Sequence, residues 1–262
     1  MPRPPATITE ARALIAACPP DELPRLLRRL AKDPRDGVVL LAKAAAGRLE
    51  RTRVEEERLT SLMARQLMLH GLGIEVVAGI DEVGCGALAG PVTACAVVLD
   101  VSCRIEGLND SKKLSPDARV RVADLVRTRS VACAVAHVGP DEIDRLGIRR
   151  ATRLAWEQAL EGLGIAVGHV LVDGNDPGAL RIPTTSIVKG DSSEASIAAA
   201  SVVAKVARDA LMAASAARYP GYAFDLNSGY GTPEHLAAIA ALGPSEFHRR
   251  SFAPCSSQEP LF

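Results

Sequence analysis

The stretch Gly79–Leu99, GIDEVGCGALAGPVTACAVVL, decides the fold of this chain. Two apolar runs, 76–80 and 91–99, flank a glycine-rich turn, and Asp81 and Glu82 follow the first run directly. Runs of this length bounded by glycine are typical of buried β-strands. Adjacent strand residues point to opposite faces, so both carboxylates serve one site only if the chain bends at once, which glycine allows. The plain alternative is a strand end marked by two acids and followed by a turn.

Further strands alternate with helices downstream of this stretch. Strands are predicted over residues 131–138, 169–172 and 185–188. Helices are predicted from the N-cap Ser115 to about residue 127, from 140 to 160 with a break near Gly147, over 194–217, and from Thr232 to Gly243. Early strands followed by strands alternating with helices predict an α/β fold, a mixed β-sheet flanked by helices.

The first part of the chain has a different pattern. Leu23, Leu27 and Leu30 recur at helical spacing, and residues 48–70 mix dense charge with leucines. We predict a helical N-terminal extension over residues 1–74, the α/β domain over 75–254 and a C-terminal tail over 255–262. Substrate contact, partner docking and passive stability are all open as roles for the extension.

Composition excludes several classes of protein. The chain has 262 residues, 48% of them apolar, and its 31 basic residues cancel its 31 acidic ones. The high apolar fraction and zero net charge exclude a disordered chain. A polyanion can bind this chain only through local groups of basic residues. There is no apolar run of about 18 residues and no signal-peptide layout, so we expect no membrane association. Six cysteines without a C-x-x-C pair indicate reduced thiols. We expect a cytoplasmic monomer.

Two further acids stand after apolar strands. Asp173 follows the run 169–172, and Asp191 follows the run 185–188 before the alanine-rich helix. Ligands of open α/β sheets gather at the carboxyl ends of strands, so we expect Asp81 and Asp173 to converge there. For Asp191 a structural alternative is open, because Asp191-Ser-Ser-Glu194 has the spacing of a capping box.

Four carboxylates in one pocket repel one another, which raises their pKa values. Divalent cations relieve that repulsion, and all-oxygen ligation suits Mg²⁺ or Mn²⁺. Two such ions about 4 Å apart promote in-line displacement at phosphorus. The absence of a His/Cys cluster in the sequence argues against zinc. We therefore predict a site for two Mg²⁺ or Mn²⁺ ions.

Six motifs occur in one order along the chain. They are GIDEVG (79–84), LNDSKKLS (108–115), LVDGN (171–175), VKGD with SIAAASVVAKVARD (188–191 and 196–209), GYGTPEH (229–235) and HRRSFAP (248–254). In this order they resemble ribonuclease HII, the type 2 ribonuclease H family, over about residues 75–254. Ribonuclease HIII is less similar, because its glycine stretch differs. The resemblance implies a ribonuclease H-like fold and endonucleolytic cleavage of RNA in RNA–DNA hybrids and at single ribonucleotides in duplex DNA, leaving 3′-hydroxyl and 5′-phosphate ends.

The resemblance also assigns residues. Catalysis and metal binding fall to Asp81, Glu82, Asp173 and Asp191, with Asp81 bridging two ions that generate the hydroxide and stabilise the leaving oxygen. Substrate contacts fall to Gly84, Cys85, Gly86, Lys112, Lys113 and Tyr230, with Tyr230 stacking on a sugar and Arg249–Ser251 contacting the nucleic-acid backbone. Without the resemblance, Tyr230 is an ordinary turn tyrosine and the lysines are a solvated pair.

Cys85 departs from the family, whose glycine stretch usually reads Gly-Arg-Gly. The 2′-hydroxyl can still be recognised by main-chain groups. A thiol cannot form an arginine's charge-assisted bond to phosphate, which is worth ~1.5–3 kcal/mol. We expect retained chemistry with weaker substrate binding or altered preference.

Two other functions are open. A hybrid-binding module without catalysis has no use for four mutually repelling acids, and a DNA nuclease or integrase on the same fold would cleave all-DNA duplex.

In the tail, Ser257–Phe262 (SQEPLF) resembles the Q-x-x-L-F peptide that docks bacterial replication proteins on the sliding clamp. We expect Gln258, Leu261 and Phe262 to anchor such docking, although Pro260 is unusual there; the alternative is a tail folded back on the domain.

Overall fold

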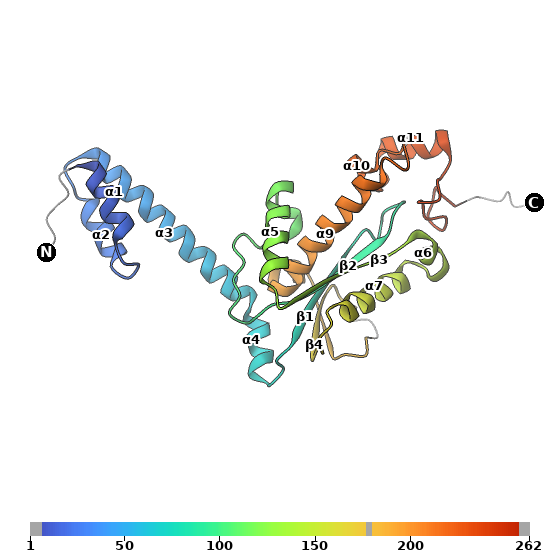
Figure 1. Cartoon of the computed structure of the whole chain (residues 1–262), viewed down its shortest axis with the longest axis horizontal. Coiled ribbons are helices and arrows are strands. Elements are labelled where there is room, and N and C mark those ends of the chain that lie inside the picture. Colours follow the sequence, from blue (N-terminus) through green and yellow to red (C-terminus); the bar gives the residue numbers. More distant parts are fainter. Residues whose placement is uncertain (1–6, 177–179, 257–262) are drawn as a thin grey trace, which may run out of the picture. The chain divides into compact units, whose positions relative to one another are not determined.

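The computed structural model describes residues 7–176 and 180–256, and the chain forms two compact units, Met1–Arg58 and Leu59–Phe262 (Figure 1). The division falls within the continuous helix α3 (Asp36–Leu62) and not at residue 74, where composition changes. The reason is packing: Leu59, Leu62 and Met63 belong to a core of the second unit.

The first unit is helical, as the sequence predicts. It contains α1 (Ile8–Ala17), α2 (Leu23–Leu30) and the first part of α3. Thr7 caps α1, because its side chain accepts a hydrogen bond from the Glu10 amide. Leu27 and Leu30, at the predicted helical spacing, lie in this unit's own apolar core with Val38 and Ala42.

The second unit is built on one mixed sheet of five strands in the order β3-β2-β1-β4-β5. The strands are β1 (Val77–Val83), β2 (Val92–Val98), β3 (Ala132–Val138), β4 (His169–Asp173) and β5 (Thr184–Ile187). β1 pairs antiparallel with β2 and parallel with β4, so it lies at the change of direction. The predicted mixed sheet is confirmed.

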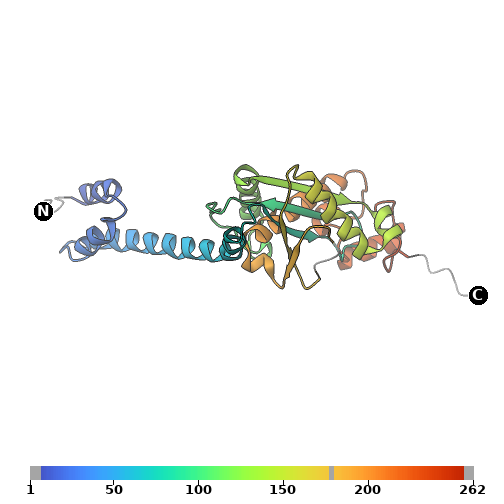
Figure 2. The same cartoon turned by 90° about the horizontal axis from the view of Figure 1, so that it is seen from below.

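Helices cover both faces of this sheet (Figure 2). One face packs against α5 (Pro116–Arg129) and α9 (Ala195–Ser215), and the other against α6 (Pro140–Leu146) and α7 (Ile148–Gly162). A Cβ on Gly79 would lie 2.3 Å from the Ser196 carbonyl carbon, so glycine allows α9 to lie directly on β1. This close approach explains the many Ala and Ser residues of α9.

The remaining elements are short. They are α4 (Ala64–Gly71), a 3-10 turn (Ser111–Lys113), α8 (Gly190–Ser193), α10 (Phe224–Asn227) and α11 (Pro233–Leu242). Ser115 and Thr232 accept hydrogen bonds from Ala118 and His235 amides, so both predicted N-caps are confirmed. The predicted break near Gly147 separates α6 from α7. None of the helices described over 7–176 and 180–256 is long and apolar enough to cross a membrane.

Candidate active site

Asp81 and Asp173 lie side by side at the carboxyl ends of two parallel strands. The last paired residues of β1 and β4 are Ile80 and Val172, and the two aspartates follow them by one residue each. Neighbouring strands are about 4.8 Å apart, so the carboxylates start from adjacent positions on one face. The Gly190 amide donates to Asp173 Oδ1 at 2.7 Å and fixes that side chain. The structure thus brings together the two acids that the sequence analysis expects to converge.

Asp81 is held in a buried position beside other acids. Its side chain is 8% exposed, and the Glu82 amide donates to its Oδ1 at 2.8 Å. Burial, followed by the negative charge of Glu82, raises the pKa of Asp81 to about 8, and Asp173 adds to the shift. A hydrogen bond with Ser201 of α9 opposes it. The ionised Asp81 carboxylate therefore destabilises the folded chain unless a positive charge lies beside it.

Glu82 occupies the other face of the sheet. Trp156 of α7 donates from Nε1 to Glu82 Oε2 at 3.0 Å. Burial raises the pKa of Glu82, and this hydrogen bond opposes the rise. The chain does not bend directly after the acids, because β1 pairs with β2 as far as Val83 and the turn begins only at Gly84, with φ +90°. The two neighbouring carboxylates consequently point to opposite faces.

Asp191 lies in α8 and is 5% exposed. The capping-box alternative is wrong: Lys189 occupies the N-cap position of α8, and the Glu194 carboxylate instead pairs with Arg65 at 2.9 Å. Lys112 donates from Nζ to Asp191 Oδ2 at 3.3 Å. An ammonium group of the chain thus compensates this buried acid.

In the described part of the chain, the four acids do not form a preassembled metal-binding shell. Within residues 7–176 and 180–256, no three His, Cys, Asp or Glu side chains are grouped closely enough to hold one ion. Glu82 and Asp191 are held by Trp156 and Lys112. The donors are nevertheless all oxygens, and the raised pKa of Asp81 reflects burial and repulsion that a divalent cation relieves. The residues therefore fit Mg²⁺ or Mn²⁺ in chemistry and charge.

Two buried arginines hold the glycine stretch. Arg208 and Arg249 are both 0% exposed, and each donates three hydrogen bonds to main-chain carbonyls. Arg249 binds the carbonyls of Gly84, Cys85 and Gly90 at 2.7–3.0 Å. Burial, with the neighbouring Arg208 charge, lowers the pKa of Arg249 to about 10.

This arrangement corrects one prediction and adds residues that sequence reasoning missed. Arg249 cannot contact nucleic acid as expected, because it is fully buried and its guanidinium group donates to main-chain carbonyls of the glycine stretch. The Arg250 and Ser251 amides donate to Asp144. Arg208 carried no signal in the sequence beyond an arginine within an alanine-rich apolar helix.

Tyr230 lies beside the same stretch. The carbonyl of Gly229 accepts from the Leu88 amide at 2.8 Å, and a Cβ at Gly229 would lie 2.5 Å from the Ala89 carbonyl oxygen. The Arg208 guanidinium lies 5.4 Å from the centre of the half-buried Tyr230 ring. Tyr230 is linked to the glycine stretch through Arg208, whose side chain lies over the Tyr230 ring and also against Gly84. Lys113 Nζ lies 3.8 Å from Asp110 Oδ2.

The Cys85 side chain faces α7. Its Sγ lies 3.5 Å from Thr152 Oγ1 and 3.8 Å from Glu82 Oε1. Burial, then the charge of Glu82, raises the pKa of the Cys85 thiol to about 11. Position 85 therefore presents a neutral thiol at neutral pH.

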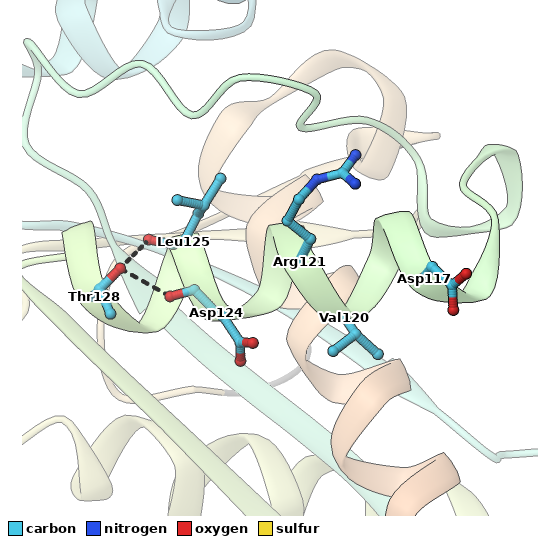
Figure 3. Close-up of a pocket in the computed structure, with 6 residues that line it drawn as sticks. All are labelled: Asp117, Val120, Arg121, Asp124, Leu125 and Thr128. Atoms are coloured by element: carbon cyan, nitrogen blue, oxygen red, sulfur yellow. Dashed lines mark hydrogen bonds between the residues drawn. The ribbon is translucent and has the colours of Figure 1, made fainter.

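A separate hollow of about 630 Å³ lies along α5 and is lined by residues of that helix alone (Figure 3). Thr128 Oγ1 donates to the main-chain carbonyls of Asp124 and Leu125 at 2.9 and 3.2 Å, so its hydroxyl is used within the helix. None of the four predicted acids lines this hollow. It contributes nothing to the predicted chemistry.

A mixed sheet with paired carboxylates at the ends of its central parallel strands defines a ribonuclease H-like nuclease domain. The model of the family described as Ribonuclease HII matches residues 78–255, and that of the Ribonuclease HII N-terminal domain matches residues 7–65. The chain belongs to the ribonuclease HII family and is an endoribonuclease of the type 2 ribonuclease H class. The family depends on divalent metal ions.

Individual relatives agree with this assignment. The chain is 40% identical over 252 residues to Ribonuclease HII of Desulfitobacterium hafniense, covering 96% of each chain. The structure is similar to that of ribonuclease H2 from Pyrococcus horikoshii, with a TM-score of 0.57, 25% identity, and coverage of 69% of this chain and 95% of that one. A similar fold occurs in the PCNA:RNase HII complex from Archaeoglobus fulgidus, with a TM-score of 0.57, 24% identity, and coverage of 68% of this chain and 95% of that one.

Proposed function

We propose that this enzyme cleaves RNA in RNA–DNA hybrids and at single ribonucleotides in duplex DNA, leaving 3′-hydroxyl and 5′-phosphate ends, and so removes ribonucleotides from DNA in the cytoplasm. The observation that carries the proposal is the adjacent placement of Asp81 and Asp173 at the ends of β1 and β4. A pure binding module would retain the cost of these acids without a use for them.

Asp81, Glu82, Asp173 and Asp191 would hold two Mg²⁺ or Mn²⁺ ions, which supply Lewis acidity for in-line displacement at phosphorus. Residues of the chain position and balance these four carboxylates. Asp81 and Asp173 present oxygens on one face, and Glu82 starts from the opposite face of the same strand end, close enough for the charge of Asp173 to raise its pKa. Trp156 orients Glu82, and the Lys112 ammonium balances Asp191. Because Lys112 is 81% exposed, it can leave Asp191 without unpacking the core.

Recognition of the ribonucleotide falls to the glycine stretch and its neighbours. Main-chain groups of Gly84, Cys85 and Gly86 would bind the 2′-hydroxyl, because this group distinguishes RNA from DNA. Arg249 supports this by fixing the Gly84 and Cys85 carbonyls. Tyr230 would stack on the sugar on the DNA side, with Lys112 and Lys113 near phosphates.

The test is a panel of duplexes with mapped products. We expect Mg²⁺- or Mn²⁺-dependent nicking of an RNA–DNA hybrid and of a DNA duplex with one ribonucleotide, and no nicking of the all-DNA duplex. End-group analysis should find 3′-hydroxyl and 5′-phosphate ends. Cleavage of all-DNA duplex would favour a DNA nuclease, and the absence of any cleavage would favour the binding module.

We also propose docking on a sliding clamp through Gln258, Leu261 and Phe262. These residues lie outside the described part of the chain. The Q-x-x-L-F pattern supports this proposal, as does the PCNA complex formed by the Archaeoglobus protein of similar fold. Removing residues 258–262 should abolish retention by immobilised bacterial clamp and leave nicking unchanged; equal retention of both chains would refute it.

A further inference from the structure

A pocket of about 460 Å³ lies between the end of β1 and the start of α7. Three arginines of α7, Arg149, Arg150 and Arg153, line it together with Glu82 and Cys85. Asp176, which follows β4, also contributes to its wall. Since Glu82 is one of the four acids of the candidate active site, the pocket adjoins that site directly.

The arginines of this pocket have donors to spare. Arg153 Nε is buried and has no hydrogen-bond partner in the described structure. Elsewhere on the described surface, arginines such as Arg53, Arg145 and Arg218 pair with carboxylates. Within residues 7–176 and 180–256, neither Arg153 nor its neighbours Arg149 and Arg150 form an ion pair with a carboxylate, so the outer nitrogens of the partly exposed Arg153 are available to an acceptor from outside the chain.

The start of α7 adds to this positive field. Gly147 is the N-cap residue of this 15-residue helix and offers no side-chain acceptor to the first-turn amides. These amides lack intrahelical partners and carry the positive end of the helix dipole. Together with the three guanidinium groups, they outweigh the carboxylates of Glu82 and Asp176 in the same pocket.

We infer that this pocket binds one phosphate of the nucleic-acid backbone, next to the phosphate that is cleaved, with Arg153 as its anchor. This inference rests on the proposed function. The planar guanidinium donates two parallel hydrogen bonds to phosphate oxygens, and helix N-termini favour the same anion. The neutral Cys85 thiol cannot attract phosphate by charge, whereas the α7 arginines reach the same pocket. The positively charged contact therefore comes from α7 and not from position 85.

The first test is binding without cleavage. In an Asp173→Asn background, Arg153→Gln should weaken the binding of a fluorescent single-ribonucleotide duplex by about tenfold, the value of one charge-assisted bond. The slope of log Kd against log salt should fall by about 0.9, because one phosphate contact is lost. Arg121→Gln on exposed α5 is the matched control and should change neither quantity.

The second test locates the phosphate. Neutral methylphosphonate linkages are placed one at a time around the ribonucleotide. One linkage should weaken binding to the parent protein and have no further effect on Arg153→Gln, because both changes remove the same contact. Arg153→Lys should recover part of the affinity through its charge. If Arg153→Gln fails to fold, Arg149→Gln with Arg150→Gln replaces it, since both side chains are exposed.

The outcomes separate this inference from the proposed function. Unchanged affinity of folded Arg153→Gln, or equal losses at every linkage without coupling, overturns the phosphate pocket. Failure of the parent enzyme to nick any ribonucleotide-containing duplex overturns the proposed function instead. Weak binding of inorganic phosphate alone, without coupling to any linkage, shows an anion pocket that the substrate does not use and also overturns the inference.

Discussion

Two polar regions of the second unit differ in how completely their hydrogen bonds are satisfied. Around the glycine stretch, the guanidinium groups of Arg208 and Arg249 donate hydrogen bonds to main-chain carbonyls. His235 Nε2 and His248 Nε2 are hydrogen-bonded to each other at 3.0 Å. At the ends of β1 and β4, Asp81 faces other acids, and Arg153 Nε in the adjoining pocket is unpaired. The first region therefore builds the shape of the site, whereas the second keeps unbalanced charge for ligands.

The largest effect is expected from removing charge in the unbalanced region. Asp81→Asn should slow cleavage by on the order of 10³-fold or more, because an essential anionic ligand is lost. The same change should raise the melting temperature of the metal-free protein, because a costly buried carboxylate disappears. Single-turnover rates and thermal melts in EDTA measure both effects. A fall in melting temperature would contradict the comparison.

The next largest effect is expected from opening the satisfied region. Arg249→Leu should lower the free energy of unfolding by about 3–5 kcal/mol, because the carbonyls of Gly84, Cys85 and Gly90 lose their donor. Denaturant titration measures this value. Arg250→Leu, whose side chain lies on the surface, is the control and should stay within about 0.5 kcal/mol. Equal stabilities of the two variants would show that the arginine does not hold the stretch.

The two regions should respond to pH in opposite directions in the absence of metal. The folded pKa of Asp81, about 8, lies above its ordinary value of 3.8, so its contribution to stability is present below pH 3.8 and is lost as pH rises to about 8. Burial lowers the pKa of His248 from 6.5 to about 4, so its contribution is present above pH 6.5 and is lost as pH falls to about 4.

Melting curves across this pH range can separate the two contributions. Asp81→Asn should remove the loss on the alkaline side only, and His248→Gln the loss on the acidic side only. The acidic loss follows because His248 is buried and lies beside His235, so a positive charge on its ring is unfavourable in the folded chain. A pH profile unchanged by either substitution would show that neither Asp81 nor His248 governs the pH dependence of stability.

The smallest effect is expected at position 85. Cys85→Arg should tighten binding of a single-ribonucleotide duplex, and by less than about tenfold, because Arg153 and its neighbours already charge the pocket. Equilibrium binding at fixed salt measures the change, with Cys103→Arg as a control outside the pocket. A gain much larger than tenfold would mean that the α7 arginines do not serve the substrate.

Local pattern predicts the elements and one acid pair. The apolar runs before Asp81 and Asp173 place both acids at strand ends, and parallel pairing then makes them neighbours. The pattern does not predict that β1 continues past Glu82, because the ladder with β2, ending at Val83 and Thr93, sets that strand's length. It also cannot distinguish the enclosed Arg249 from the pocket-lining Arg153, since their surroundings come from residues far away in the sequence.

Single-turnover cleavage of a DNA duplex with one ribonucleotide, by the parent enzyme and by Asp173→Asn, shows whether the acids at the ends of β1 and β4 carry out the reaction. We expect nicking by the parent enzyme with Mg²⁺ or Mn²⁺, none in EDTA, and a folded Asp173→Asn protein that fails to nick with either ion. Nicking by Asp173→Asn at the parent rate would contradict the claim that the acids at the ends of β1 and β4 act together.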